Sequence, residues 1–325
     1  MKYRTFGKTG MEVSEVGFGC GRTGGLLIDG NDEDRRAAIR KALDGGINWF
    51  DTAEAYGDGK SEEALGWLLQ EVEETPHVST KVTVDPGAGD LPGQIKSHCE
   101  ASLKRLRRDW VDILQIHNRI DPGAGPKTLT VEQVLGPGGI AEGLEKMKQE
   151  GKARFMGLTA LGDAPSLCRV IESGRFDSVQ MFYNMVNPSA VRAMPPAWTG
   201  QNLDGIAEAC RAAGTGILAI RVLVGGLIPG GDPGRRVSMM TKETDKETEE
   251  VKADAALATV GDGYGTRAQT GLRFALACPD ISVALVGIGA TGHVDEAIEA
   301  SGMGPLPHEA IRRLERLYQT DFQTG

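Results

Sequence analysis

Short apolar stretches typical of β-strands recur along the chain, and segments with helical spacing separate them. Branched or aromatic side chains dominate most of these stretches, and polar or glycine positions bound them. Their regular recurrence predicts an alternation of strands and helices over most of the chain. The stretches are residues 15–19, 48–51, 77–82, 111–117, 153–159, 178–181, 216–220 and 283–287.

The intervening segments place apolar residues three or four positions apart, which is the spacing of one helix face. Ile39 and Ala42 are an example, and the helix that they predict ends at the Gly-Gly pair 45–46. It begins at Asn31 or Asp32, because short polar side chains cap helix N-termini. Eight strand–helix units on one chain predict an α/β fold, the (β/α)8 TIM barrel.

Two further elements lie outside the eight units. Residues 2–6 and 11–13 flank a Gly-Lys-Thr-Gly turn, so they predict an N-terminal β-hairpin ahead of the barrel. Residues 307–318 predict an extra C-terminal helix after the eighth unit. Because no change of composition marks a linker, we expect a single domain over residues 1–325.

Two long segments interrupt the alternation. Residues 182–200 are rich in Pro and Met and have the character of a loop. Residues 224–265 begin with several glycines and become strongly charged at 241–254. For the charged part we expect a solvated surface helix, with a lid over a cofactor or substrate as the alternative, because long loops in compact domains are usually functional or disordered.

Composition narrows the class of partner. The 325 residues carry a formal net charge of −9, whereas nucleic-acid binders normally have a basic surplus. No apolar run approaches the roughly 18 residues of a membrane span, and the first residues do not resemble a signal peptide. The five cysteines lie far apart, without metal-type spacing. We therefore expect a cytoplasmic protein without a metal that acts on a small molecule, and the sequence carries no signal for its oligomeric state.

Titratable side chains follow three neighbouring predicted strands at the points where the strands end. Asp51 ends the second strand and Tyr56 follows it, Lys81 lies near the end of the third, and His117 ends the fourth. In a (β/α)8 barrel the active site lies at this face. One polar residue there is commonly a satisfied buried group, but four from adjacent strands indicate chemistry.

This set of residues suits the reduction of a carbonyl group. Tyrosine has a pKa of about 10, and a nearby ammonium lowers it by stabilising the phenolate. Asp51 can hold the ammonium of Lys81 in place, and His117 can polarise a carbonyl oxygen. Tyr56 would then protonate the oxyanion that forms when hydride reaches the carbonyl carbon. Because side chains do not supply hydride, a nicotinamide cofactor is implied.

Two long motifs resemble those of the aldo-keto reductase family. Residues 46–57 (GINWFDTAEAYG) resemble its first signature, and residues 111–117 (VDILQIH) resemble its second. Later landmarks match at 157–159, 179–180, 268–269 and 272–273, and the likeness extends over nearly the whole chain. It implies an NAD(P)H-dependent oxidoreductase that reduces aldehydes or ketones and reversibly oxidises alcohols, with Tyr56 as general acid. The implied catalytic residues are Asp51, Tyr56, Lys81 and His117.

The resemblance also implies a cofactor site along the same rim. Thr159 and Gln180 would hold the nicotinamide amide, and loops after the first, seventh and eighth strands would hold the rest. Residues 286–300 contain no Lys or Arg, and His293 lies near the position where NADPH-preferring members usually place Arg. NADP(H) is the family default, and NAD(H) is the alternative. The implied contacts are Gly21, Arg22, Asp51, Thr159, Gln180, Arg221, Val222, Leu223, Gly225, Gly287, Gly289, Ala290, His293 and Glu296.

Three other interpretations can each be distinguished by a specific feature. The G-x-G-x-x-G patterns at 19–24 and 287–292 suggest a Rossmann fold, but the first is not followed at once by a helix and the second lies too near the C-terminus. A nucleotide-binding regulatory subunit of the same fold would show a damaged set of catalytic residues. A barrel lyase would use Lys81 as a Schiff base.

Overall fold

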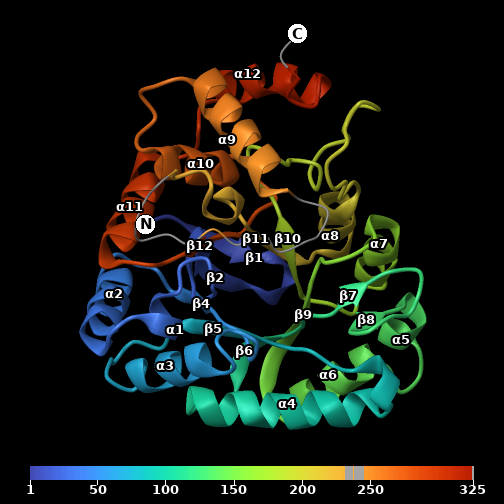
Figure 1. Ribbon diagram of the computed structural model, residues 1–325. Helices are drawn as coiled ribbons and strands as arrows, with labels where there is room; N and C mark the ends of the chain where they lie inside the picture. Colours follow the sequence, from blue (N-terminus) through green and yellow to red (C-terminus); the bar gives the residue numbers. More distant parts are fainter. Residues whose placement is uncertain (231–236, 238–244, 324–325) are drawn as a thin grey trace.

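The computed structural model describes residues 1–230, 237 and 245–323. Its centre is a closed barrel of eight parallel strands, which follow one another around the barrel in chain order until β12 pairs with β3 (Figure 1). The predicted (β/α)8 barrel is confirmed. The strands are β3 (Val16–Gly19), β4 (Trp49–Asp51), β5 (His77–Val82), β6 (Val111–Ile116), β9 (Ala153–Thr159), β10 (Ser178–Phe182), β11 (Gly216–Ile220) and β12 (Val283–Gly287).

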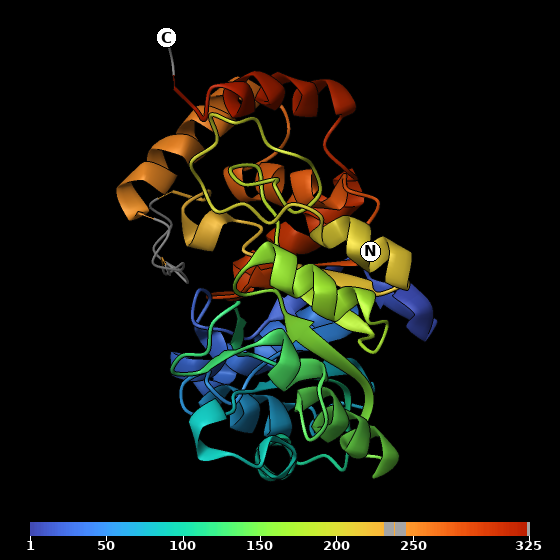
Figure 2. The ribbon, with the colours of Figure 1, turned by 90° about the vertical axis from the view of Figure 1, so that its right-hand side faces the viewer.

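Helices surround the barrel and bury the outer faces of its strands (Figures 1 and 2). Most side chains of the strands are therefore apolar on both faces, as is typical of parallel sheets. The first large helix begins as predicted, because the Asn31 side chain accepts a hydrogen bond from the backbone N–H of Asp34. The surrounding helices are α2 (Asp32–Asp44), α3 (Lys60–Leu68), α4 (Leu91–Leu106), α6 (Ile140–Gln149), α7 (Ala164–Glu172), α8 (Ile206–Ala213), α10 (Arg267–Leu276) and α11 (Thr291–Met303).

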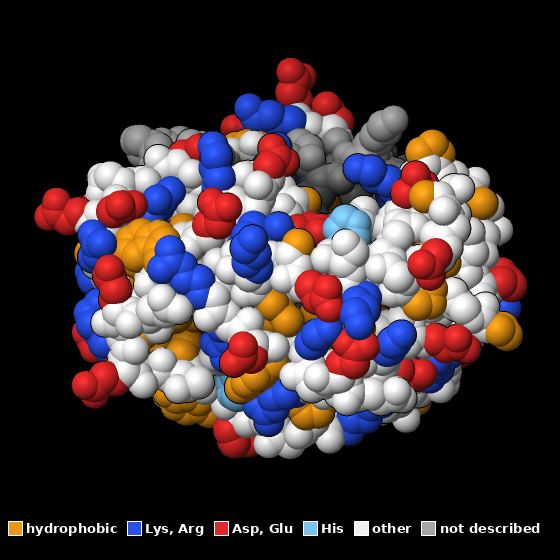
Figure 3. All heavy atoms as spheres, turned by 90° about the horizontal axis from the view of Figure 1, so that it is seen from below, with side chains coloured by type: hydrophobic (Ala, Val, Ile, Leu, Met, Phe, Trp, Pro, Cys, Tyr) orange, Lys and Arg blue, Asp and Glu red, His pale blue; other side chains and the backbone are white. Residues whose placement is uncertain are grey.

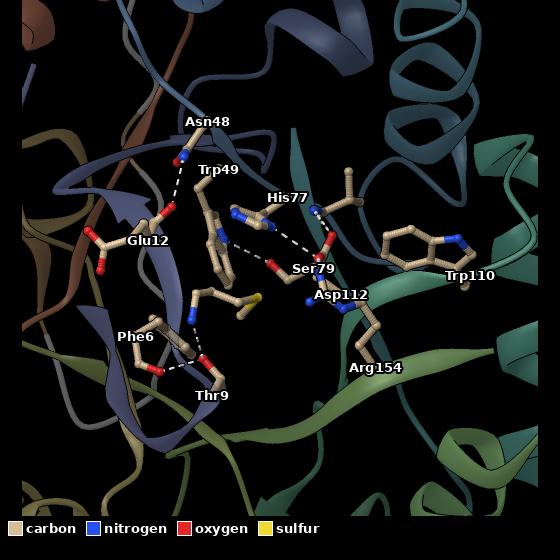
Figure 4. Close-up of polar contacts among 12 residues, drawn as sticks. Phe6, Thr9, Glu12, Asn48, Trp49, His77, Ser79, Trp110, Asp112 and Arg154 are labelled. Carbon is tan, nitrogen blue, oxygen red and sulfur yellow. Dashed lines mark hydrogen bonds and ion pairs between the residues drawn. The ribbon is translucent and has the colours of Figure 1, made fainter. Parts of the chain in front are cut away.

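The predicted N-terminal hairpin is present and closes the amino end of the barrel. Strands β1 (Tyr3–Phe6) and β2 (Met11–Ser14) pair antiparallel. Phe6 packs on Trp49 at the start of β4, with ring centroids 4.9 Å apart. Figure 4 shows this amino end of the barrel, where the Trp49 indole N–H donates to Ser79 Oγ at 3.2 Å. The amino end is thus filled by packed side chains, which leaves the carboxyl end for ligands.

The C-terminal part adds two helices, which lie at the top of the view in Figures 1 and 2. Helix α12 (His308–Gln319) is the predicted extra helix, and it packs against α9 (Lys246–Val260). The predicted charged segment is thus partly helical, although its residues 241–244 lie outside the described residues. Most of its described residues are exposed, as expected, but Lys252 is buried and its Nζ lies 2.7 Å from Asp321 Oδ1. This buried ion pair fixes α9 to the C-terminal end of the described chain.

Several short elements were not predicted from the sequence. They are α1 (Leu26–Asp29), α5 (Val131–Leu135) and the two-residue strands β7 (Arg119–Ile120) and β8 (Thr128–Leu129). Segments this short carry too few residues for a periodic pattern. Helix α5 did have a usable signal, because Thr130 and Gln133 form a capping box.

The face over α3 and α4 has the mixed charge of a solvated surface. Figure 3 shows Lys and Arg side chains interspersed with Asp and Glu on the side that lies below in Figure 1. Exposed ion pairs of this kind contribute at most about 1 kcal/mol each. Among helices of the described residues, none has the length and hydropathy needed to cross a membrane.

Candidate active site

Lys81 connects the four predicted catalytic residues at the carboxyl end of the barrel. Its Nζ lies on β5 and donates to Asp51 Oδ2 at 2.6 Å, to the Thr52 carbonyl at 2.7 Å and to the Tyr56 hydroxyl at 3.3 Å. An ammonium has three N–H donors, so all of them are used. The Tyr56 oxygen therefore accepts from Lys81, and its own proton is left to donate elsewhere.

Asp51 is fixed by further hydrogen bonds from two other strands. Its Oδ1 accepts from Ser79 Oγ at 2.6 Å and from Gln180 Nε2 at 2.5 Å. Ser79 in turn accepts from the Trp49 indole, so one series of hydrogen bonds joins the amino end of the barrel to the Asp51 carboxylate. The carboxylate of Asp51 is 5% exposed, and these bonds replace the water that it loses on burial.

Because Ser79 links Trp49 to Asp51 by hydrogen bonds, we expect Ser79→Ala to destabilise the protein. The change removes a hydrogen bond to a buried carboxylate and leaves the Trp49 indole N–H without its partner. We expect the free energy of unfolding to fall by about 1–3 kcal/mol, measured by urea denaturation. Ser178→Ala is the matched control, because the buried Ser178 Oγ has no hydrogen-bond partner among the described residues. Equal losses in the two variants would contradict the proposed series of hydrogen bonds.

Burial determines the protonation of Tyr56 and Lys81. Desolvation raises the pKa of Tyr56 above its usual value, and the Lys81 charge opposes this without overcoming it. Lys81 does act to lower the Tyr56 pKa, as expected from the sequence, but the effect of burial, which the sequence does not reveal, is larger. Desolvation lowers the pKa of Lys81, but the charge of Asp51 outweighs it and leaves the pKa raised. Tyr56 is a phenol and Lys81 an ammonium at neutral pH.

His117 completes the group from the residue after β6. Its ring meets the Tyr56 ring edge-on, with centroids 6.1 Å apart. Desolvation, with a smaller effect from the Lys81 charge, lowers the pKa of His117 to about 3. The imidazole is therefore neutral at physiological pH, and it can donate a hydrogen bond without carrying charge.

These protonation states predict a level pH profile for any reaction that needs the Tyr56 proton. Above its pKa of about 3, His117 stays neutral, and the raised pKa keeps Tyr56 protonated at neutral and mildly alkaline pH. We expect kcat/KM for carbonyl reduction to show no inflection from either group between about pH 5 and 9. Steady-state rates across this range provide the test. An inflection near pH 6.5 that disappears in His117→Gln would show that His117 titrates normally.

A cavity of about 440 Å³ opens above these residues. Of the predicted residues, those that line it are Gly21, Arg22, Asp51, Tyr56, His117, Gln180, Arg221, Val222, Leu223, Gly225 and Gly287. Lys81 does not line the cavity itself, but it donates hydrogen bonds to Asp51 and Tyr56, which do. Six further lining residues were not among the predicted catalytic and cofactor-binding residues, although most of them directly adjoin predicted site residues. These are Gly19, Thr23, Ala55, Ile220, Gly226 and Leu285.

Five predicted cofactor residues lie away from the lining of this cavity. Thr159 is fully buried at the end of β9. His293 and Glu296 lie together at a separate small recess, which Gln269 and Leu223 also line. The remaining two are Gly289 and Ala290, which precede α11.

The recess beside α11 has its own hydrogen bonds. The Gly289 backbone N–H donates to His293 Nδ1 at 3.1 Å, and Thr266 donates its hydroxyl to Glu296. The Nδ1 atom of His293 is thus the acceptor in this contact. Gln269 was seen in the sequence as a family landmark, and its place here could not be read from the chain alone.

Arg221 occupies a strained position at the rim. Its backbone φ is +56°, a conformation that costs energy for a residue with a side chain. Asn184 Nδ2 stabilises it by donating to the Arg221 carbonyl at 3.0 Å. The guanidinium lies 5.4 Å from the Phe182 ring centroid, and the charge of Glu249 acts on it from α9. Burial lowers the pKa of Arg221, which remains charged.

The rim has features that fit a nicotinamide dinucleotide. The buried Thr159 Oγ1 has no hydrogen-bond partner among the described residues, and such an atom suits an amide ligand. The backbone turns at Gly225 and Gly226 have φ of +62° and +101°. Turns of this kind present backbone N–H groups to phosphates, as does the N-terminus of a helix such as α11.

Comparisons with known proteins agree with this geometry. The family model described as Aldo/keto reductase family matches residues 15–319. L-galactose dehydrogenase of Arabidopsis thaliana is 28% identical over 310 residues, which are 92% of this chain and 88% of that protein. A probable voltage-gated potassium channel subunit beta of the same plant is 35% identical over 125 residues, or 36% of this chain and 37% of its own.

A solved structure also matches over the full length. It is an aldo/keto reductase from Klebsiella pneumoniae in complex with NADP and acetate. It covers 100% of this chain and 98% of its own, with a TM-score of 0.68 and 22% sequence identity. At this identity the likeness establishes a shared fold.

Proposed function

We propose a specific reaction for this chain, which belongs to the aldo/keto reductase family and is an NAD(P)-dependent oxidoreductase. The reaction is the reversible reduction of a small aldehyde or ketone to an alcohol. The observation that carries this proposal is the placement of Lys81 Nζ between Asp51 Oδ2 and the Tyr56 hydroxyl, at 2.6 and 3.3 Å, beneath an open cavity. A bound nicotinamide cofactor would supply or accept the hydride.

In this reaction the chain's own residues handle the proton and the carbonyl oxygen. His117, which is neutral, would donate a hydrogen bond to the oxygen and orient it beside Tyr56. Tyr56 would give its proton to the oxyanion as charge develops there. Lys81 would stabilise the resulting phenolate through its direct hydrogen bond, and Asp51 would keep Lys81 charged. Alcohol oxidation would run through the same positions in reverse.

The cofactor would lie along the rim from β9 to β12. Gln180 and Thr159 would hold its amide group, and the turns at Gly225 and Gly287 would hold its phosphates. NADP(H) is the cofactor that we propose, with support from the NADP complex of the Klebsiella structure. NAD(H) is the alternative, because His293 stands where a cation for the 2′-phosphate would be expected.

Two other functions have less support. The partial likeness to a channel subunit beta favours a nucleotide-binding regulatory role, but all four residues that we propose to be catalytic are present, and Lys81, Asp51 and Tyr56 are joined by hydrogen bonds. A Schiff-base lyase needs a lysine with a lowered pKa. The pKa of Lys81 is raised, and all three of its N–H donors are used.

The test is a titration of the purified protein with NADPH and NADH, followed by a panel of aldehydes and ketones monitored by nicotinamide absorbance. We expect saturable binding of at least one cofactor and turnover of at least one small carbonyl compound. Binding without turnover of the panel would favour the regulatory role. Borohydride trapping of a Lys81 adduct with a carbonyl compound would favour the lyase.

A further inference from the structure

The positive charges that line the cavity outnumber the negative ones. Lys81 neutralises Asp51, with their charged atoms 2.6 Å apart, and His117 is uncharged. Two arginines remain among the described lining residues, Arg22 and Arg221. The cavity is therefore positive in a chain whose formal net charge is −9. A positive cavity in an acidic protein favours an anionic ligand.

The two arginines differ in how far they are already engaged. Arg221 is partly buried, stacks on Phe182 and feels the charge of Glu249. Arg22 is exposed at the cavity mouth, and no hydrogen bond or ion pair joins it to another described residue. A guanidinium has five N–H donors and binds carboxylates in a bidentate manner. Arg22 is thus the cation of this cavity that has donors to spare.

The position of Arg22 is set by its neighbour Gly21. A Cβ atom built on Gly21 would lie 3.2 Å from two ring atoms of Tyr56 and 3.6 Å from its hydroxyl oxygen. The backbone of this loop therefore passes directly over the proposed proton donor. The Arg22 side chain leaves the backbone one residue later and lines the same cavity. A molecule with its carbonyl oxygen at Tyr56 and an anionic group at Arg22 would therefore lie within the cavity that both residues line.

We propose that Arg22 binds the carboxylate of the substrate, and that the preferred substrates are short-chain aldehydes or ketones that also carry a carboxylate. This inference rests on the proposed function and assigns Arg22 to the substrate, whereas the sequence analysis assigned it to the cofactor. In the reaction the carbonyl carbon gains a hydride and its oxygen gains the Tyr56 proton. The carboxylate is unchanged and serves to hold the substrate in position.

The experiment compares substrates that differ in the carboxylate and otherwise match. Succinic semialdehyde is paired with butanal, and 4-carboxybenzaldehyde is paired with benzaldehyde. For at least one pair we expect kcat/KM of the carboxylated member to be about 10–100-fold higher, as one charge-assisted contact allows. The preference should fall at high salt, because Arg22 is exposed.

The variants Arg22→Gln and Arg22→Lys test the residue itself. In Arg22→Gln the ratio of kcat/KM within the preferred pair should fall to about 1 through a higher KM for the carboxylated member, and Arg22→Lys should keep part of the ratio. The control is Arg312→Gln, which removes an equal charge from an exposed position of α12 and should preserve the ratio. The affinity for NADPH, measured by fluorescence titration, should change less than the substrate ratio.

The possible results distinguish a failure of the proposal for Arg22 from a failure of the proposed reductase function. Turnover of the neutral aldehydes without preference for their carboxylated partners would overturn the role of Arg22 and leave the reductase standing. A loss of NADPH affinity in Arg22→Gln, with equal loss for both members of a pair, would show that Arg22 binds a cofactor phosphate. Failure to turn over either member of both pairs, in a protein that also binds no cofactor, would overturn the reductase proposal as well.

Discussion

Tyr56→Phe is expected to lower kcat for carbonyl reduction by about 100- to 10,000-fold, the range that general acid catalysis contributes. The substitution removes the hydroxyl that accepts from Lys81 Nζ at 3.3 Å and keeps the ring that packs edge-on against His117. Because the ring is retained, cofactor affinity should stay within a few-fold of the original. Single-turnover rates and a binding titration measure the two effects separately.

A near-normal kcat in Tyr56→Phe would show that another group supplies the proton. His117 is the neighbouring candidate, but its pKa of about 3 leaves it without an extra proton at neutral pH. The variant Tyr183→Phe is a suitable control. Tyr183 is buried, stacks on Phe274 and lies outside the lining of the cavity.

Lys81→Met is expected to lower both activity and stability. The side chain of Lys81 is fully buried, and its loss leaves the Asp51 carboxylate without its counter-charge. Removal of one partner of a buried ion pair costs about 3–5 kcal/mol, which urea denaturation would measure. Activity should fall by at least about 100-fold, because the developing phenolate of Tyr56 loses its stabilising ammonium.

A double variant separates the two effects of Lys81. Lys81→Met combined with Asp51→Asn removes both charges, so most of the lost stability should return while activity stays low. If the double variant is no more stable than Lys81→Met, the unpaired carboxylate is not the cause of the loss. If Lys81→Met alone keeps both stability and activity, the role proposed for this lysine is wrong.

The sequence by itself determined the barrel and brought together the four residues that we propose to be catalytic. Hydrophobic periodicity located the eight strands to within a residue or two at each end, because strands that are buried on both faces are mostly apolar. Asp51, Tyr56, Lys81 and His117 could be identified because each lies at or just after a strand end. Parallel strands bring these ends to one rim, so position along the chain predicts proximity in space.

Contacts between distant residues, the lining of the cavity and the pKa values were determined only by the tertiary structure, because they depend on distance and burial. Gln180 donates to Asp51 from 129 residues away, across the barrel interior, and no local pattern encodes that contact. Thr159 and His293 belonged to one predicted cofactor set, yet one is buried outside the cavity lining and the other lies in a separate recess. The raised pKa of Tyr56 likewise depends on how much water the closed barrel excludes. Strand ends follow from local periodicity, whereas contacts across the barrel and the loss of solvent arise only when the barrel closes.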